Sequence, residues 1–338
     1  MGSIPPAGTN LRFHASLDCF RELMTHSTEA THAFLRGPAI VFVNPSAGRG
    51  RARAYLPRLR RLFESLEMSS EFVETDSAAD LELAARQSVS HDQQLLLALG
   101  GDGTFQALAN GAFEGSAILG ILPAGGGNDF AAALGLPNDP LVAGEAIVKD
   151  GKPRYVDLVR ARTADGRTRL YAGGGGVGLD AEAARQAAGA YRRFPGRLRY
   201  VAAALRALYE HQPLNVQIEF PRGEHARLEA SALLAGVLNT PTYGAGLRLA
   251  PGASIDDGAL NLVLIESLSK LEVLRLLPRL LGTGDLRTSR VKRWSIEGVK
   301  ISTDRPSFFH GDGELFGPAP VEIEVVPKAV RVLVPASR

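Results

Sequence analysis

Short hydrophobic runs alternate with amphipathic stretches through the first half of the chain. Apolar or β-branched runs that predict buried strands lie at 39–43, 71–75, 94–99 and 117–123. Stretches with leucine, phenylalanine or alanine at helical spacing lie at 53–66, 78–89 and 105–113. Strands that alternate with helices predict a parallel sheet with helices on both faces. Ligands of such sheets bind beyond the carboxyl ends of the strands.

The second half of the chain has a different pattern. Short strand-like runs are joined by turn signals such as Asp165-Gly166 and Asp257-Gly258, and helical spacing returns only at about 181–211 and 269–282. This pattern predicts a mainly antiparallel β-sandwich or barrel with two helical insertions. We therefore expect an N-terminal extension at 1–37, an α/β domain at 38–150 and a β-rich domain at 151–338.

Composition narrows the class of protein. The chain has 338 residues, 45% of them hydrophobic, and a net charge of only +2, which argues against a general nucleic-acid binder. Its single cysteine, Cys19, allows no internal disulfide. No run is long enough to cross a membrane, and the first residues do not resemble a secretory signal. A cytoplasmic location is therefore expected.

The segment LALGGDGTFQALANG, residues 97–111, carries the first candidate chemistry. Gly100, Gly101 and Gly103 follow a predicted strand and open a predicted helix, so their N–H groups can surround a phosphate. Thr104 adds a hydroxyl or a helix cap. Asp102 would repel phosphates unless a cation such as Mg²⁺ lies between them. The simpler alternative is that Asp102 caps its own helix.

Two other nucleotide-binding patterns are not supported. The chain has no G-x-x-x-x-G-K-[ST] segment, so it lacks a Walker-type phosphate loop. The run GGGGVG at 173–178 matches a dinucleotide fingerprint in its letters, but it lies in the β-rich half without a strand–helix–strand frame.

Five segments, in this order and spacing, resemble the diacylglycerol kinase catalytic family, to which bacterial soluble lipid kinases and sphingosine kinases belong. They are NPSAG (44–48), LGGDGTFQALANG (99–111), ILPAGGGNDFAAALGLP (121–137), DDGALNLVLI (256–265) and HGDGE (310–314). GGDGT alone is also shared with NAD kinases and phosphofructokinases. The resemblance runs from about residue 38 to the C-terminus and implies a phosphofructokinase-like α/β domain followed by a β-sandwich.

The resemblance also implies a nucleotide site for ATP with Mg²⁺. Its residues are Asn44, Pro45, Ser46, Gly48, Thr75, Gly100, Gly101, Asp102, Gly103, Thr104, Gly126, Asn128 and Asp129. Asp129 would be a second carboxylate near the metal. Gly126 stands where the family usually has a threonine that touches ATP, so this chain keeps a backbone N–H there and loses a hydroxyl. An ordinary strand–helix loop is the alternative for residues 44–48.

Three further assignments follow from the resemblance. Glu314 is the expected proton acceptor for the lipid hydroxyl, with Asp102 as its catalytic partner; an exposed turn carboxylate is the alternative for Glu314. Asp180 matches a position near the acceptor head group. A structural Mg²⁺ is expected at one turn, for which a plain hairpin is the alternative. Its ligands would be Ser254, Asp257 and Ala259.

Basic residues interleaved with aromatic ones suggest contact with an anionic membrane. Six arginines lie between positions 185 and 206, among three aromatic residues, and the segment 287–293 adds four more cations. A solvated helix face is the alternative.

These patterns together predict an ATP- and Mg²⁺-dependent lipid kinase, with diacylglycerol as the first expected acceptor and phosphatidic acid as the product. An NAD kinase-like enzyme is one rival interpretation, but the sequence shows Asn128-Asp129 and a late Asp-Gly-Glu in place of that family's Asn-Glu pair. A catalytically silent nucleotide or lipid sensor is the other. The sequence leaves the acceptor lipid and the oligomeric state open.

Overall fold

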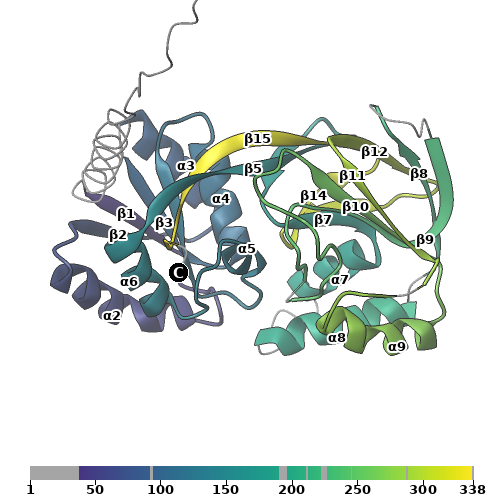
Figure 1. The fold of residues 1–338 in the computed structure, drawn as a ribbon, viewed down its shortest axis with the longest axis horizontal. Helices are drawn as coiled ribbons and strands as arrows, with labels where there is room; N and C mark the ends of the chain where they lie inside the picture. The colour runs from purple at the N-terminus through teal and green to yellow at the C-terminus, as the bar shows by residue number, and fades with distance from the viewer. Residues whose placement is uncertain are drawn as a thin grey trace, which may run out of the picture.

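The computed structural model describes residues 38–91, 94–189, 196–210, 212–221, 227–244, 246–286 and 288–336. Two domains lie side by side along its long axis, the first in purple and blue and the second mainly in green (Figure 1). The expected extension at 1–37 lies outside the described residues.

The first domain is built on parallel strands. Its sheet has the order β4-β3-β1-β2, with every neighbouring pair parallel. The strands are β1 (Ala39–Val43), β2 (Ser70–Glu74), β3 (Leu95–Gly100) and β4 (Ile118–Pro123). The helices are α2 (Arg51–Ser65), α3 (Ala78–Ser90), α4 (Asp102–Ala112), α5 (Asp129–Ala133) and α6 (Pro140–Asp150). The alternation predicted from the hydrophobic pattern is confirmed.

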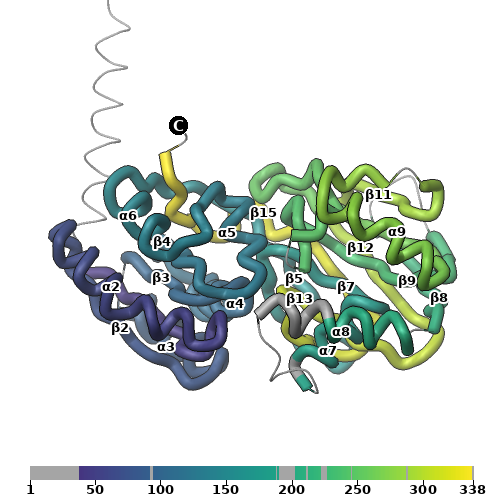
Figure 2. The backbone as a smooth tube through the Cα atoms, turned by 90° about the horizontal axis from the view of Figure 1, so that it is seen from below, coloured from purple at the N-terminus to yellow at the C-terminus, as the bar shows by residue number. Residues whose placement is uncertain are grey.

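Helices cover both faces of this sheet, so its central strands are fully enclosed. Every residue of β3 and β4 is buried. Helix α2 packs with α6 and helix α3 packs with α4, on opposite faces (Figures 1 and 2). The amphipathic spacing explains the packing, because Leu59 and Phe63 of α2 and Leu81 and Ala85 of α3 point into one core.

The second domain is mainly antiparallel, as the turn-rich pattern predicts. Its strands are β6 (Thr168–Tyr171), β7 (Gly174–Gly178), β8 (Leu214–Glu219), β9 (Arg227–Leu238), β10 (Leu260–Glu266), β11 (Val291–Ile296), β12 (Gly298–Thr303), β13 (Phe308–Gly311) and β14 (Glu314–Pro318). Strand β9 pairs with β8 through its first half and with β7 and β10 through its second half. The strands therefore enclose a core of their own.

Alternation along the strands divides the apolar residues of this domain between two cores. On β10, Leu262 and Leu264 point into the sandwich core, while Val263 and Ile265 point to the other face. Three helices cover that other face. They are α7 (Leu179–Ala188), α8 (Gly196–Glu210) and α9 (Lys270–Leu281).

Two long strands, β5 (Lys152–Thr163) and β15 (Val321–Val334), run through both domains (Figure 1). They pair antiparallel along almost their whole length. At its end, β15 joins the first sheet, where Arg331 and Val332 pair parallel with Ile118 and Leu119 of β4. Residues from far beyond position 150 therefore complete the first core.

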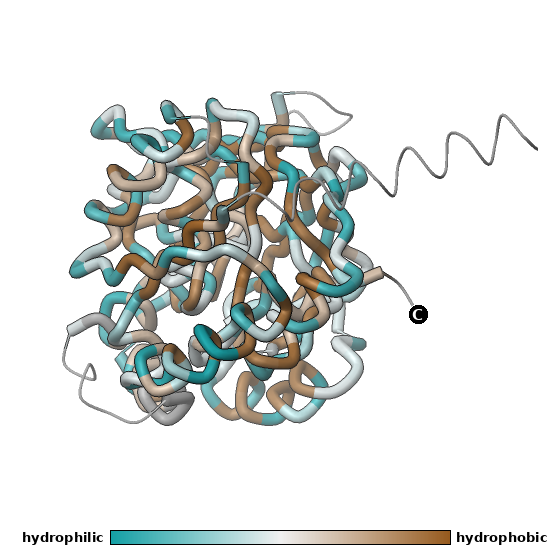
Figure 3. Tube along the Cα trace, turned by 90° about the vertical axis from the view of Figure 1, so that its left-hand side faces the viewer, coloured by the Kyte–Doolittle hydropathy of each residue, from teal (hydrophilic) through white to brown (hydrophobic). Residues whose placement is uncertain are grey.

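The hydropathy of the residues agrees with this arrangement of sheets and helices. In Figure 3, hydrophobic positions run through the interior and hydrophilic ones gather on many outer turns. Among the described residues, no helix is both long enough and apolar enough to span a membrane.

Candidate active site

The predicted nucleotide loops meet at the carboxyl edge of the parallel sheet. The backbone N–H of Asn44 donates to the carbonyl of Leu99 at 3.1 Å, and Asn44 Nδ2 donates to Thr104 Oγ1 at 3.2 Å. The N–H of Ala124 donates to the carbonyl of Gly100 at 2.7 Å. The loops after β1, β3 and β4 are thus tied to one another by hydrogen bonds.

The remaining predicted positions of the first two loops lie at the same edge. Ser46 Oγ donates to Asn44 Oδ1 at 2.8 Å, with Pro45 between them in the turn. Thr75 is buried at the end of β2, and its hydroxyl donates to the carbonyl of Val43 at 3.3 Å. Gly48 has φ +57°, and a Cβ there would lie 2.1 Å from the carbonyl oxygen of Ala124.

Close backbone contact requires glycine where the loops after β3 and β4 meet. A Cβ on Gly125 would lie 2.5 Å from Gly101 Cα. Asn128, in the left-handed region at φ +60°, accepts a hydrogen bond from the Gly125 N–H at 3.0 Å. Gly126 lies inside this turn. The two loops are therefore packed backbone against backbone.

Asp102 does not cap its own helix. The N-cap of α4 is Gly101, and the Asp102 carboxylate instead accepts from the backbone N–H groups of Asp129 at 3.2 Å and Phe130 at 3.0 Å. Burial, and then the charge of Asp129, raise the pKa of Asp102 to about 6, against the lowering effect of those N–H groups. The alternative interpretation of Asp102 as a simple cap of α4 is therefore wrong.

The turn between β13 and β14 reaches this edge from the second domain. A Cβ placed on Gly103 would lie 3.5 Å from Glu314 Oε1 and 3.9 Å from the carbonyl oxygen of Asp312. Glu314 is exposed, whereas the Asp312 carboxylate accepts from the N–H groups of Ala172, Gly173 and Gly174 at 2.8, 3.0 and 3.1 Å. The turn brings Glu314 to the N-terminus of α4.

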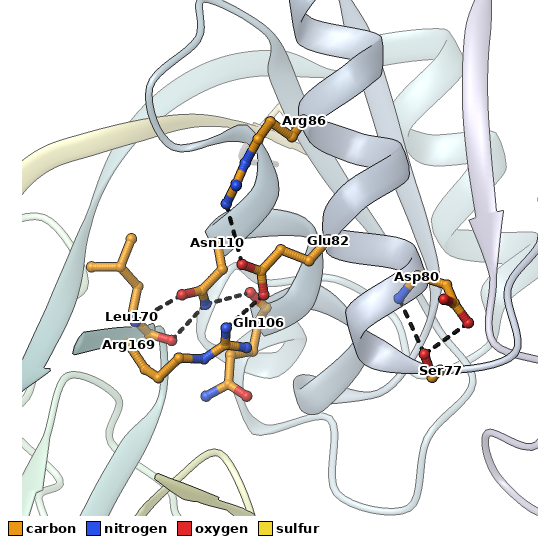
Figure 4. A network of polar contacts seen from close by, with 8 residues as sticks. All are labelled: Ser77, Asp80, Glu82, Arg86, Gln106, Asn110, Arg169 and Leu170. Carbon is orange, nitrogen blue, oxygen red and sulfur yellow. Dashed lines mark hydrogen bonds and ion pairs between the residues drawn. The ribbon is translucent and has the colours of Figure 1, made fainter. Parts of the chain in front are cut away.

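Helix α4 is held against the second domain by its buried side. Gln106 Nε2 donates to the carbonyl of Gly311 at 3.1 Å. Asn110 exchanges hydrogen bonds with the backbone of Leu170 in β6, at 2.9 and 3.0 Å. Next to it, Arg169 forms an ion pair with Glu82 of α3 at 2.6 Å (Figure 4). These contacts fix the start of α4 relative to the β13–β14 turn.

The comparisons with known proteins agree with this arrangement. The family described as diacylglycerol kinase catalytic domain matches residues 38–161, and the YegS C-terminal NAD kinase beta sandwich-like domain matches residues 175–334. A diacylglycerol kinase of Mycobacterium tuberculosis (strain H37Rv) is 30% identical over 305 residues, covering 88% of this chain and 96% of the relative. The chain belongs to the diacylglycerol kinase family. It is a lipid kinase.

Two other relatives of this lipid kinase extend the comparison. A diacylglycerol kinase of Bacillus subtilis (strain 168) is 25% identical over 302 residues, covering 89% of this chain and 97% of the relative. The crystal structure of a diacylglycerol kinase from Bacillus anthracis (strain Sterne) has a TM-score of 0.64 at 19% identity, covering 88% of this chain and 97% of that one. The α/β domain followed by an antiparallel β-domain is therefore the fold of the family, as the sequence predicts.

Asp180 lies in a buried cluster beside the β13–β14 turn of the lipid kinase. Tyr243 Oη donates to Asp180 Oδ2 at 2.9 Å and contacts His310 Nε2 at 2.5 Å. His310 Nε2 is also 3.4 Å from Asp180 Oδ2, and His310 Nδ1 is buried without a hydrogen-bond partner. Burial, followed by the charge of Asp180, raises the pKa of Tyr243 well above its usual value, so Tyr243 stays a neutral donor.

The predicted structural cation site lies in a separate turn. Ser254 Oγ donates to Asp256, and the N–H of Ala259 donates to Asp257 Oδ1 at 3.0 Å. The N–H of Gly258 donates to the buried Asp157 at 2.7 Å. The turn is thus closed by its own hydrogen bonds, and none of these contacts joins it to the carboxyl edge.

The donor set near Asp102 fits Mg²⁺ held partly by phosphates. No group of three or more histidine, cysteine, aspartate or glutamate side chains with metal-binding geometry occurs within the described ranges. Asp102 and Asp129 are nevertheless close enough for one charge to raise the pKa of the other. Mg²⁺ is commonly bound by one or two carboxylates plus substrate phosphates and water, which is what this pair offers.

The sequence did not identify three residues that build the site. Asp312, Tyr243 and Gln106 take their roles from contacts across the fold. Only Asp312 left a signal, since its place between two glycines in HGDGE marks a tight turn. Of the predicted basic–aromatic segment, residues 190–195 and the side chains of 196–201 lie outside the described part of the chain.

Proposed function

We propose that this lipid kinase transfers the γ-phosphate of ATP to the hydroxyl of diacylglycerol, with Mg²⁺, and releases phosphatidic acid and ADP. The names of the Mycobacterium and Bacillus relatives support this choice of acceptor. The glycine-rich carboxyl edge supports a polyphosphate donor, because it combines backbone N–H groups with the positive end of α4.

The nucleotide would bind along the carboxyl edge. Asn44, Ser46 and Thr104 place polar side chains there, and the packed glycines of the next two loops would supply backbone N–H groups. Asp102 and Asp129 would hold Mg²⁺, which neutralises charge that develops on the phosphates. Asp102 would then be ionised, because a bound cation lowers the pKa that burial raises.

The observation that carries the proposal is the position of Glu314 over Gly103 at the start of α4. A lipid hydroxyl placed between them would give its proton to the Glu314 carboxylate. The hydroxyl oxygen would form a bond to the γ-phosphorus while the bond from that phosphorus to the β–γ bridging oxygen breaks. ADP carries away the electron pair of the broken bond.

Two further roles belong to the same proposal. Asp180, held by Tyr243, would accept a hydrogen bond from the polar end of the acceptor lipid. The turn of Ser254, Asp257 and Ala259 would hold a structural Mg²⁺ through one carboxylate, two carbonyls and water. The lipid would be taken from an anionic membrane surface by transient contact.

Phosphate transfer from labelled ATP, with Mg²⁺ and a panel of lipid alcohols in mixed micelles, tests the proposal. We expect labelled phosphatidic acid, and a loss of about 100-fold or more in Glu314→Gln with ATP affinity unchanged. Glu322→Gln is the matched control, since Glu322 is an exposed strand carboxylate of the same domain. Labelled NAD, or Glu314→Gln as active as the native enzyme, would refute the proposed reaction or its base.

A further inference from the structure

Two helices of the second domain leave an apolar surface uncovered. Helices α8 and α9 lie side by side below the β-strands in Figure 1. They touch through Lys270, whose Nζ donates to the carbonyl of Tyr209 at 2.6 Å and lies 4.5 Å from the centre of the Tyr209 ring. The start of α9 is therefore held against the end of α8.

The spacing of apolar residues on α9 explains why only part of them is buried. Val273, Leu276 and Leu280 recur every three or four residues and pack against the core beneath the helix. A second set with the same spacing points away from that core. At 100° per residue it forms a separate stripe, made of Leu271, Leu274, Leu277 and Leu281.

This outer stripe is strongly exposed. We call it, together with two residues of α8, the leucine face: Leu205 (50% exposed), Tyr209 (69%), Leu271 (56%), Leu274 (45%), Leu277 (37%) and Leu281 (59%). Eleven large hydrophobic side chains are exposed in the described part of the chain, and these are six of them. Large hydrophobic side chains gathered on one exposed surface are typical of a site that binds a partner or a membrane.

The charges beside the leucine face are mainly basic. Arg275 and Arg279 follow one flank of the stripe, a third of a turn from the leucines. The single acidic residue of α9, Glu272, is engaged with Ser269 in the capping box at the start of the helix. An apolar stripe bordered by arginines matches the boundary between acyl chains and anionic head groups.

We propose that the leucine face docks this lipid kinase onto an anionic phospholipid bilayer, with the leucines among the acyl chains and Arg275 and Arg279 at the head groups. The proposal rests on the proposed function, because it supplies the surface for taking a lipid from a membrane. It also places that surface near the acceptor site. Helix α7 carries Asp180 in its first turn and is joined to α8 by a hydrogen bond from Gln186 to Glu210 at 3.1 Å.

Sedimentation with vesicles of equal parts phosphatidylcholine and phosphatidylglycerol tests the docking directly. The variant Leu274→Ser/Leu281→Ser should bind about tenfold or more weakly than the native enzyme, because two apolar side chains no longer enter the bilayer. Leu83→Ser/Val142→Ser is the matched control, since these residues are 56% and 51% exposed on the first domain. Arg275→Gln/Arg279→Gln should weaken binding to these vesicles and leave binding to pure phosphatidylcholine unchanged.

Activity is measured in parallel on diacylglycerol in vesicles and on a short-chain diacylglycerol in free solution. The leucine variant should lose activity about tenfold on vesicles and keep it in solution. Normal vesicle binding without phosphorylation of either lipid would leave the docking supported and refute the proposed acceptor. The docking is overturned if the leucine variant binds vesicles like the native enzyme, or if the native enzyme does not bind them. It is also overturned if the substitutions only dissociate a dimer.

Discussion

Two partly buried aspartates, Asp102 and Asp312, lie in the candidate active site, and both are held by backbone N–H groups. Burial, and then the charge of Asp102, raise the pKa of Asp312 to about 7, although the N–H groups of Ala172, Gly173 and Gly174 act against this. The site therefore brings two carboxyl groups close together in a partly buried region. Such a region is suited to a cation and unfavourable without one.

The stability of the ligand-free enzyme should therefore depend on pH between about 4 and 7. Both carboxyl groups have folded pKa values above the usual 3.8, so the folded protein holds protons that the unfolded chain releases. The stabilisation is complete below the unfolded pKa of 3.8, falls as the pH rises above it, and is fully lost above about pH 6 to 7. We would measure the free energy of unfolding with denaturant, without Mg²⁺ and ATP, at a series of pH values. For each proton released, this free energy should fall by up to about 1.4 kcal/mol per pH unit.

Asp312→Asn should flatten this pH dependence, because it removes one of the two titrating groups. Asp165→Asn is the control: Asp165 is exposed, and hydrogen bonds from Arg167 and Thr163 lower its pKa to about 2, outside the window. If the free energy of unfolding changed with pH equally steeply in the native enzyme and in Asp312→Asn, the effect could not be assigned to Asp312.

The sequence predicted the residues whose contacts are local and missed those whose contacts are remote in the chain. Gly100 to Thr104 could be predicted, because a strand, a turn and a helix start within a few residues of one another. The contacts of Tyr243 with Asp180 and His310 join positions more than sixty residues apart in the chain, and no linear pattern marks them. Asp102 was predicted from its place after a strand, but its hydrogen bonds to the start of α5 need the folded sheet.

Two glycines of helix α4 differ in whether the structure has room for a Cβ atom. Gly103 faces Glu314, and a Cβ there would lie at ordinary contact distance, 3.5 Å from Glu314 Oε1. We expect Gly103→Ala to fold normally and even to gain up to about 1 kcal/mol of stability from its better helix propensity. The added methyl group would occupy the space proposed for the reacting hydroxyl, so kcat should fall by about tenfold or more. Steady-state kinetics and thermal unfolding measure the two effects separately.

Gly111 provides the contrast on the same helix. A Cβ there would lie 2.3 Å from the carbonyl oxygen of Glu82 in α3, so the two helices would have to separate. Gly111→Ala should cost about 1–3 kcal/mol of stability. If Gly103→Ala were destabilised like Gly111→Ala, or if it kept full activity, the space in front of Glu314 would not be the site of reaction.

At the scale of the whole molecule, the sequence predicted the class of each domain but not their connection. Local periodicity is sufficient to distinguish a parallel α/β domain from an antiparallel one. The pairing of β15 with β4 depends instead on a contact between residues more than two hundred positions apart. A strand that ends the second domain and completes the first sheet therefore looks, in the sequence, like any other strand.

Asp157 lies where the two long strands pass from one domain to the other. It is fully buried in β5, opposite the irregularity in β15 between Val326 and Val330. Its carboxylate accepts from the N–H of Lys328 at 2.7 Å and from that of Gly258 at 2.7 Å. One side chain thus ties β15 and the 254–259 turn to β5.

Asp157→Asn keeps the shape of this side chain but replaces one acceptor oxygen with an NH₂ group. One of the two partly buried N–H groups must then lose its partner, so we expect the free energy of unfolding to fall by about 1–3 kcal/mol. Asp256→Asn is the matched control in the same turn, because its surface ion pair with Arg154 contributes only about 0–1 kcal/mol. Since β5 and β15 belong to both domains, the substitution should lower the unfolding temperature of both domains together. Separate melting of the two domains in Asp157→Asn, or a loss no larger than in Asp256→Asn, would show that this carboxylate does not join them.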